Sequence, residues 1–159
     1  MNAAAVQTGT WASHNPEETF DTGRRVGERL EGGEVLLLSG TLGAGKTVFT
    51  KGLAAGLGLD PAEVSSPSFT LVNRHGEGRL VLYHLDLYRL AEGPGAAHAV
   101  ELEELLADER AVIVIEWAER MGDYRLPATT WRVRIDGDGE DPRLINITRA
   151  ADSEANVSN

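Results

Sequence analysis

The sequence contains no cysteine, which excludes a disulfide framework and any metal site built on thiolates. It has no apolar run near the roughly 18 residues that a membrane-spanning helix needs. Its N-terminus lacks the basic patch and apolar segment of a secretory signal peptide. Together these absences predict a cytoplasmic protein without a membrane segment.

Positive charge is also scarce. The 159 residues include 25 acidic and 15 basic side chains, which gives a formal net charge of -10 at pH 7. A surface of this sign repels nucleic-acid phosphates, so direct binding to nucleic acid is not the first expectation. Only Lys46 and Lys51 are lysines. A lysine at a motif position is therefore more informative here than in a lysine-rich chain.

A glycine-rich motif follows a short apolar strand at 35–38. Residues 40–47, GTLGAGKT, match the phosphate-binding pattern G-x-x-x-x-G-K-[ST], and an amphipathic helix is predicted at 46–57. Glycines let backbone N–H groups turn onto phosphates, and the helix N-terminus adds its dipole. We expect Lys46 to reach the β- and γ-phosphates and Thr47 to bind Mg²⁺. The nucleotide contacts predicted from the motif are Thr41, Leu42, Gly43, Ala44, Gly45, Lys46, Thr47 and Val48.

Two carboxylates end apolar, strand-like runs further along the chain. Glu116 ends AVIVIE, and Asp86 ends LVLYHLD. Phosphoryl transfer needs a carboxylate near Mg²⁺, usually at the end of a buried strand beside the phosphate loop. We therefore predict that Asp86 and Glu116 are the catalytic pair and, with Thr47, the metal ligands. The sequence leaves open which carboxylate holds Mg²⁺ and which positions the attacking water.

Two further side chains accompany these carboxylates. His84 lies two positions before Asp86 and so points to the same side of a strand. We expect a hydrogen-bonded structural histidine there rather than a catalytic one. Trp117 follows Glu116 directly and is expected either to pack or to flank the nucleotide.

The hydrophobic pattern alternates between strands and helices. Together with the glycine-rich motif between strand and helix, it predicts an α/β, P-loop NTPase-like three-layer fold with a mixed, mainly parallel central sheet and helices on both faces. Residues 1–149 are expected to form one domain, 150–159 a disordered tail, and 91–97 a linker. Helices are predicted at 16–30, 46–57 and 100–106, the last with a solvated acidic face. Strands are predicted at 6–11, 35–38, 69–75, 80–86, 111–115, 131–135 and 144–148.

The phosphate motif alone does not separate the classes of nucleotide-dependent protein. The guanine-reading pattern Asn-Lys-x-Asp is absent from the sequence, so GTP is disfavoured. An ATPase, a small-molecule P-loop kinase and a nucleotide-gated binding protein remain open. ADP release that depends on one acceptor metabolite would favour the kinase, and partner affinity that depends on the bound nucleotide would favour the gated protein.

Four blocks in order resemble the TsaE (YjeE) family of bacterial ATPases. They read LSGTLGAGKTVFTKGLAAGLG, VSSPSFTLVNRH, YHLDLYRL and VIVIEWAER. The resemblance runs from about Thr19 to Arg149, and four blocks in register are far more specific than the phosphate motif alone. Members of this family are required for threonylcarbamoyladenosine at position 37 of tRNAs that read codons starting with A.

The resemblance implies roles for particular residues. Residues 40–47 would bind ATP, and Asp86 and Glu116 would form the acidic pair of the Mg²⁺ and hydrolysis site. Residues 64–70 would be a switch-like segment near the γ-phosphate, and Trp117 would lie beside the nucleotide. The implied partners are the TsaD and TsaB proteins, with tRNA contacted indirectly. The implied activity is an ATPase that is weak alone and stimulated by these partners.

The chain departs from the family pattern at three places. Thr41 stands where the family usually has Asp, which removes a carboxylate from the start of the phosphate loop. Ser68 replaces the usual Thr and keeps a hydroxyl. The Gly/Ala-rich stretch between Leu90 and Glu101 lacks the usual acidic Leu-Gly pattern, which changes the surface expected to face a partner.

Overall fold

The computed structural model describes residues 6–41, 45–67, 70–76, 78–137 and 142–150. Within these residues, seven strands form one sheet in the order β1-β7-β6-β2-β5-β4-β3. The strands are β1 (Gly9–Ser13), β2 (Val35–Gly40), β3 (Val72–His75), β4 (Val81–Asp86), β5 (Ala111–Glu116), β6 (Thr130–Asp136) and β7 (Arg143–Arg149). The helices are α1 (Pro16–Arg29), α2 (Lys46–Gly56), α3 (Pro94–Ala99) and α4 (Leu102–Leu106), with short 3₁₀ turns η1 (Pro61–Glu63) and η2 (Ala118–Met121). The expected tail at 150–159 lies outside the described residues, apart from the buried Ala150.

The sheet is parallel at its centre and antiparallel at its edges. Strands β6, β2, β5 and β4 run parallel, whereas β3 pairs antiparallel with β4, and β7 pairs antiparallel with both β6 and β1. The predicted mixed sheet is confirmed. The prediction that it is mainly parallel is wrong, because three of the six pairings between described strands are antiparallel. Loop length accounts for two of these, since the short β3–β4 and β6–β7 connections cannot hold the crossover that a parallel pair needs.

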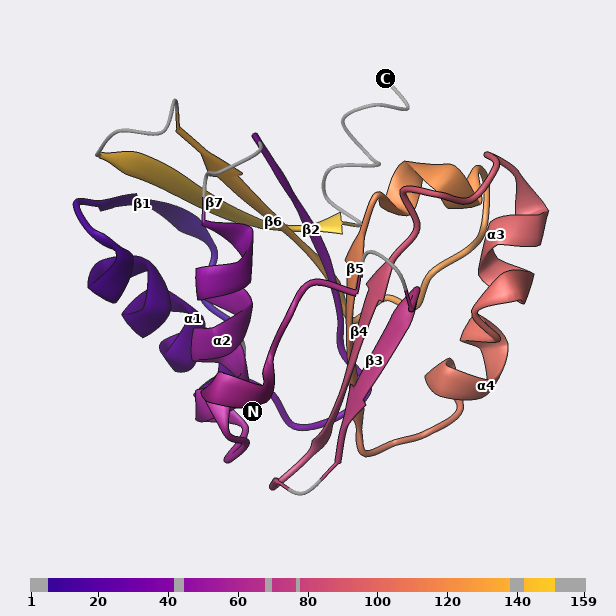
Figure 1. Ribbon diagram of the computed structural model, residues 1–159, viewed down its shortest axis with the longest axis horizontal. Helices are drawn as coiled ribbons and strands as arrows, with labels where there is room; N and C mark the ends of the chain where they lie inside the picture. Colours follow the sequence, from indigo (N-terminus) through magenta and orange to yellow (C-terminus); the bar gives the residue numbers. More distant parts are fainter. Residues whose placement is uncertain (1–5, 42–44, 68–69, 77, 138–141, 151–159) are drawn as a thin grey trace.

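Helices cover both faces of the sheet, as predicted. Helices α1 and α2 lie on one face, and α3 and α4 lie on the other (Figure 1). Successive residues of the central strands therefore enter two separate cores. In β2, Leu36 and Leu38 join the core beneath α1 and α2, while Val35 and Leu37 join the core beneath α3 and α4. Burial on both faces explains the unbroken apolar runs of β2 and β5.

Glycines bring α1 and α2 into direct backbone contact. A Cβ atom at Gly23 would lie 2.2 Å from the Phe49 carbonyl oxygen, and one at Gly52 would lie 2.0 Å from the Phe20 carbonyl oxygen. This packing fixes the start of α2 against α1, and with it the position of the motif lysine.

The stretch 91–97, predicted to be a linker, is partly helical. Helix α3 begins at Pro94 and runs to Ala99, and Ala96 and Ala97 are buried. Proline suits the first turn of a helix, and alanine has the highest helix propensity. The glycine and proline content of the segment does not by itself indicate helix α3. The predicted strand at 69–75 begins later in the structure, at Val72, and Phe69 lies outside the described residues.

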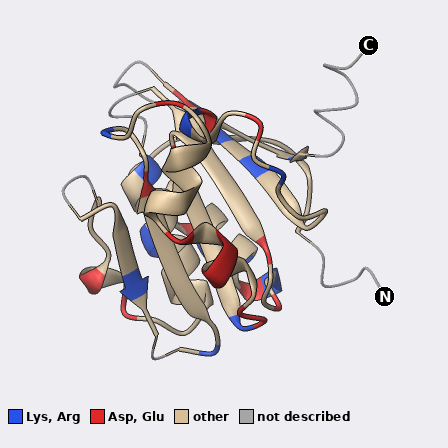
Figure 2. Ribbon diagram, turned by 90° about the vertical axis from the view of Figure 1, so that its right-hand side faces the viewer, with Lys and Arg blue, Asp and Glu red and all other residues tan. Residues whose placement is uncertain are grey.

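Acidic side chains gather on α4. Figure 2 looks onto the face covered by α3 and α4, where Glu103 and Glu104 of α4 are exposed. The predicted solvated helix face is confirmed. Among the described residues, no helix has both the length and the apolar character to cross a membrane.

Candidate functional site

The site begins where β2 ends, at the glycine-rich loop 40–47. Gly40 has a φ of +146°, and a Cβ there would lie 2.0 Å from the Ile135 carbonyl oxygen of β6. Gly45 has a φ of +106° and forms the left-handed N-cap of α2. Both positions therefore need glycine, for close approach in one case and for backbone conformation in the other. The predicted contacts Leu42, Gly43 and Ala44 lie outside the described residues.

Lys46 opens α2 and points back across the end of the sheet. Its Nζ atom lies 3.4 Å from the Gly40 carbonyl oxygen and 3.7 Å from Glu116 Oε1. The side chains of Lys46 and Glu116 are only 18% and 10% exposed. An ammonium group this buried needs a compensating charge, and Glu116 supplies it. Thr47 and Val48 follow in the first turn of α2 and are half-buried.

The two predicted carboxylates lie side by side. Asp86 ends β4, Glu116 ends β5, and the two residues are directly paired in the parallel ladder. Leu38 of β2 is the partner of Glu116 on its other side. Both carboxylates are nearly buried, with 7% of each residue exposed. Asp86 Oδ1 accepts a hydrogen bond of 3.0 Å from the Tyr88 backbone N–H, which ties this carboxylate to the turn after β4.

His84 contacts Oε2 of Glu116, whereas Lys46 faces Oε1. Its ring is fully buried, and Nε2 lies 2.7 Å from Glu116 Oε2. The prediction of a hydrogen-bonded histidine on the same side of β4 as Asp86 is confirmed. The bonding partner, Glu116, was not predicted. The two residues lie 32 positions apart in sequence and meet through the β4–β5 register.

Trp117 is held at the rim of the site by a strained backbone. Its φ of +62° is unusual for a bulky residue, and its side chain remains 38% exposed. The ring lies 4.8 Å from the Tyr88 ring, centroid to centroid, and the Arg120 guanidinium lies 5.5 Å from it. The contacts of Tyr88 and Arg120 with Trp117 were not predicted. Their only signal was position, since each lies within four residues of a predicted carboxylate.

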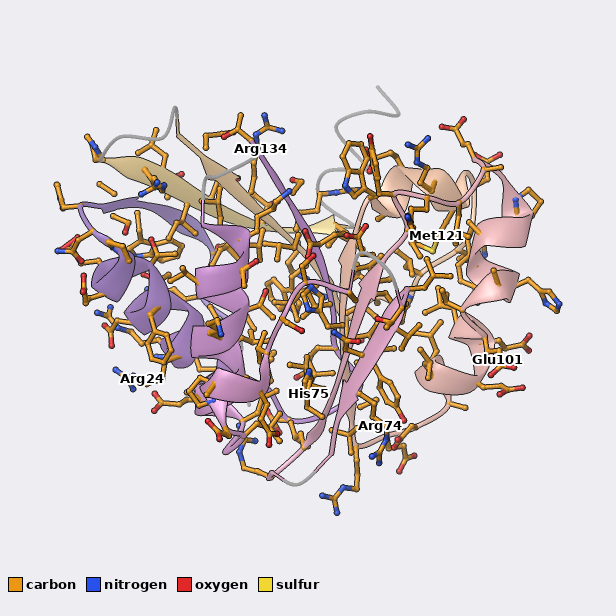
Figure 3. The ribbon with its side chains drawn as sticks, in the orientation of Figure 1. Arg24, Arg74, His75, Glu101, Met121 and Arg134 are labelled. Carbon is orange, nitrogen blue, oxygen red and sulfur yellow. The ribbon has the colours of Figure 1, made fainter. Side chains whose placement is uncertain are left out.

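A pocket of about 260 Å³ opens between the glycine-rich loop and Trp117. It is lined by Leu38, Ser39, Gly40, Thr41, Lys46, Trp117, Glu119 and Arg134. Arg134, at the end of the molecule where β2 ends (Figure 3), was not predicted. Larger hollows of about 510 and 570 Å³ lie elsewhere, and no described residue of the glycine-rich loop lines them. The chemistry therefore identifies the smaller pocket as the site.

Thr41 anchors the start of the glycine-rich loop to the end of β6. Its hydroxyl donates a hydrogen bond of 2.6 Å to the Gly137 carbonyl oxygen and accepts one of 3.3 Å from the Gly137 N–H. The threonine that replaces the usual family Asp therefore has a structural contact of its own.

The second lysine holds the segment that follows α2. Lys51 Nζ donates hydrogen bonds of 3.2 Å to the Pro61 carbonyl oxygen and 2.9 Å to that of Val64. Asn73 of β3 continues the anchoring, because its side-chain amide donates to the Ser65 carbonyl oxygen at 3.3 Å. The segment 64–67 is thus tied to α2 and to β3 by side chains that the sequence did not single out.

The donor set fits magnesium better than a transition metal. Among the described residues there is no group of three or more histidine, cysteine or acidic side chains that could hold a metal ion. Two adjacent carboxylates, Asp86 and Glu116, and the Thr47 hydroxyl in the first turn of α2 instead offer oxygen ligands. Mg²⁺ is commonly held by one or two carboxylates together with the phosphates of its substrate. The residues present therefore fit this ion.

Fold and site together define a class: an α/β protein that gathers a glycine-rich loop, a lysine and two carboxylates at the carboxyl edge of a parallel sheet centre. Comparison with known proteins identifies the family within this class. The family model "Threonylcarbamoyl adenosine biosynthesis protein TsaE" matches residues 13–145. The chain belongs to the TsaE family.

Relatives extend this match over most of the chain. The tRNA threonylcarbamoyladenosine biosynthesis protein TsaE of Bacillus subtilis is 39% identical over 142 residues, covering 87% of this chain and 84% of the relative. That of Treponema pallidum is 43% identical over 136 residues, covering 80% and 94%. The crystal structure of Bacillus subtilis YdiB aligns with a TM-score of 0.68 and 31% identity over 97% of this chain and 98% of that one.

Proposed function

We propose that the chain is a Mg²⁺-dependent ATPase with a P-loop NTPase-like fold that supports tRNA threonylcarbamoyladenosine formation. The observation that carries this proposal is the position of Lys46, which lies at the end of the glycine-rich loop within 3.7 Å of Glu116. The relatives from Bacillus subtilis and Treponema pallidum are named as tRNA threonylcarbamoyladenosine biosynthesis proteins, which supports this assignment. An acidic protein that acts through a protein complex, with tRNA contacted indirectly, also suits the net charge of -10.

Each residue has a role in this proposal. Backbone N–H groups at the start of α2 bind phosphate oxygens, and Lys46 compensates the charge of the terminal phosphates. Thr47 and one of the two carboxylates hold Mg²⁺, which when bound neutralises charge on the phosphates. The other carboxylate accepts a hydrogen bond from the attacking water and so orients it. Trp117 flanks the nucleotide at the rim of the pocket.

Hydrolysis by the isolated chain is expected to be slow. Among the described residues that line the pocket, Arg134 is the one arginine. Its Nε atom forms an ion pair with Asp136 Oδ2 at 2.9 Å. Charge supplied by a partner, such as an arginine finger, accelerates many phosphate-loop enzymes strongly. We propose the TsaD and TsaB proteins as the partners that complete the site.

The test is the steady-state ATPase rate with Mg²⁺, measured for the chain alone and with TsaB and TsaD from the same source. We expect a low rate that the pair stimulates. Glu116→Gln and Asp86→Asn should each lower turnover on the order of 100-fold, while ATP binding, measured by calorimetry, changes far less. Glu103→Gln on the exposed face of α4 is the matched control and should behave as wild type.

Other outcomes would point elsewhere. Normal hydrolysis by both carboxylate variants would remove Asp86 and Glu116 from the mechanism. ADP release that appears only with one added metabolite would favour a small-molecule kinase. ATP-dependent partner binding with no hydrolysis in any mixture would favour a nucleotide-gated binding protein.

A further inference from the structure

His84 is a buried titratable group to which the proposed function gives no role. It lies in the middle of the molecule with none of its surface exposed. Its Nε2 atom contacts Glu116, and its Nδ1 atom is buried without a hydrogen-bond partner among the described residues. Burying an imidazole with one unpaired nitrogen is costly. Leu82 and Val114 beside it are apolar, and Asn73 of β3 is its direct partner in the β3–β4 ladder. Packing alone does not account for a histidine at this position.

The strand register explains how His84 reaches Glu116. His84 is directly opposite Val114 in the β4–β5 ladder, and Glu116 lies two residues further along β5. Residues two apart on a strand share a face, so the two side chains are diagonal neighbours on the α2 side of the sheet. The separation of 2.7 Å between Nε2 and Oε2 is that of a short, charge-assisted hydrogen bond.

Glu116 is thereby held at both carboxylate oxygens. Oε2 faces the His84 ring at 2.7 Å, and Oε1 faces the Lys46 ammonium at 3.7 Å. An ionised carboxylate can only accept hydrogen bonds, so the ring nitrogen that faces it must be the donor. The bond to His84 therefore fixes the rotation of the carboxylate and leaves Oε1 directed at the lysine of the glycine-rich loop.

We propose that His84 is a positioning residue, whose Nε2–H holds Glu116 with Oε1 directed toward Lys46 and the nucleotide phosphates. This rests on the proposed function, because it is through Glu116 that His84 acts. Groups that orient a ligand or a catalytic carboxylate in this way commonly change activity by 10-fold to 100-fold when removed. His84 itself touches neither nucleotide nor water in this role.

The decisive variants are His84→Leu and His84→Gln. Leucine fills the space without a donor, whereas a glutamine amide can donate from near the position of Nε2. We expect His84→Leu to lower kcat by about 10-fold to 100-fold with little change in KM for ATP, and His84→Gln to restore most of the loss. Val114→Ala opens a cavity beside the ring but keeps the hydrogen bond, so it should lower thermal stability and leave kcat unchanged.

A double-mutant cycle separates positioning from general disruption. If His84 acts through Glu116, adding His84→Leu to Glu116→Gln should lower kcat little further, because the carboxylate to be oriented is already gone. Full additivity of the two effects would overturn the proposal. So would a His84→Leu variant that folds and turns over ATP as wild type does.

A spectroscopic readout tests the hydrogen bond without any turnover. In protein labelled with ¹⁵N-histidine, His84 should carry its proton on Nε2, and Glu116→Gln should shift that signal while Asp86→Asn should not. A proton on Nδ1 alone would overturn the proposal. A wild-type chain without Mg²⁺-dependent hydrolysis, alone or with partners, would overturn the proposed function and this inference together. An active wild type with an unaffected His84→Leu variant would overturn only the inference.

Discussion

Arg79 and Lys46 are both cations placed beside the ends of α1 or α2, at opposite ends of the molecule. The Arg79 guanidinium donates to the carbonyl oxygens of Leu30 at 2.6 Å and Gly27 at 2.9 Å, near the end of α1, and approaches that of Gly56 in α2 at 3.4 Å. Lys46, at the start of α2, has one carbonyl at 3.4 Å and one carboxylate at 3.7 Å.

The two cations differ in whether their hydrogen-bond donors remain available to a ligand. Arg79 satisfies carbonyl groups that helix ends leave without intrahelical partners, so its donors are directed at the protein itself. The Lys46 contacts are longer than those of a good hydrogen bond, and its neighbour Glu116 is itself a proposed site residue. Arg79 joins α1 to α2. Lys46 lies where a bound anion could accept shorter hydrogen bonds from its ammonium group.

Removing Lys46 gives the largest expected effect and tests the binding side of this comparison. Lys46→Ala should weaken ATP binding by at least about 100-fold, or ~3 kcal/mol, because the phosphates lose their cation. Thermal stability should fall less than ATP affinity, because His84 still bonds to the Glu116 carboxylate after its cation is removed. Calorimetric titration with ATP and a melting curve measure the two quantities. Retained ATP affinity would place the nucleotide elsewhere.

Removing Arg79 should have the opposite pattern. Arg79→Ala leaves the carbonyl oxygens of two helix ends to water, and we expect a loss of about 2 kcal/mol in the free energy of unfolding. ATP affinity should stay at the wild-type value. Arg110→Ala, which removes a single exposed hydrogen bond to the Arg79 carbonyl oxygen, is the matched control for denaturant unfolding. If Arg79→Ala weakened ATP binding as much as Lys46→Ala, the distinction between the two cations would fail.

Local sequence patterns predicted the elements that carry the site. The helix predicted at 16–30 is found as α1, and the Asn15 side chain caps it by accepting a hydrogen bond from the Glu18 N–H. Apolar runs located β2 and β5, whose ends hold the glycine-rich loop and Glu116. These features depend on residues close together in the chain, which is why one sequence was enough to find them.

Contacts between distant residues were not predictable in the same way. Thr41 and Gly137 lie 96 positions apart, and Arg79 reaches carbonyl groups 49 and 52 positions away. Such contacts depend on strand order and register, which a single sequence does not specify. The same holds for the pairing of His84 with Glu116, where both residues were singled out but their hydrogen bond was not.

Breaking the Thr41 anchor should have a smaller effect than either cation variant. Thr41→Val keeps the shape of the side chain but removes the hydroxyl that bonds to both backbone groups of Gly137. We expect ATP affinity to fall by a factor that corresponds to about 1 kcal/mol, because the start of the glycine-rich loop loses its tie to β6. Thr41→Ser, which keeps the hydroxyl, should restore the affinity. Equal loss in both variants would argue that the methyl group, rather than the hydrogen bond, matters.

The smallest expected effect concerns His75, which lies on β3 in the middle of the molecule (Figure 3). Burial, and then the nearby His84, lower the pKa of His75 below its ordinary value of 6.5, and Glu63 on η1 opposes this only in part. The folded state therefore takes up a proton at lower pH than the unfolded chain does. Stability should be intact above pH 6.5 and fall as the pH drops below it, because the unfolded chain then binds more protons.

His75→Gln should flatten this pH dependence. The variant has no proton to take up at this position, so its free energy of unfolding should fall less than that of wild type between pH 7 and pH 5. Denaturant unfolding at several pH values measures the slope. His98→Gln, on the exposed side of α3, is the matched control and should keep the wild-type slope. An equal slope in wild type and His75→Gln would assign the loss of stability in acid to other groups, because removing this imidazole would then have removed no proton uptake on unfolding.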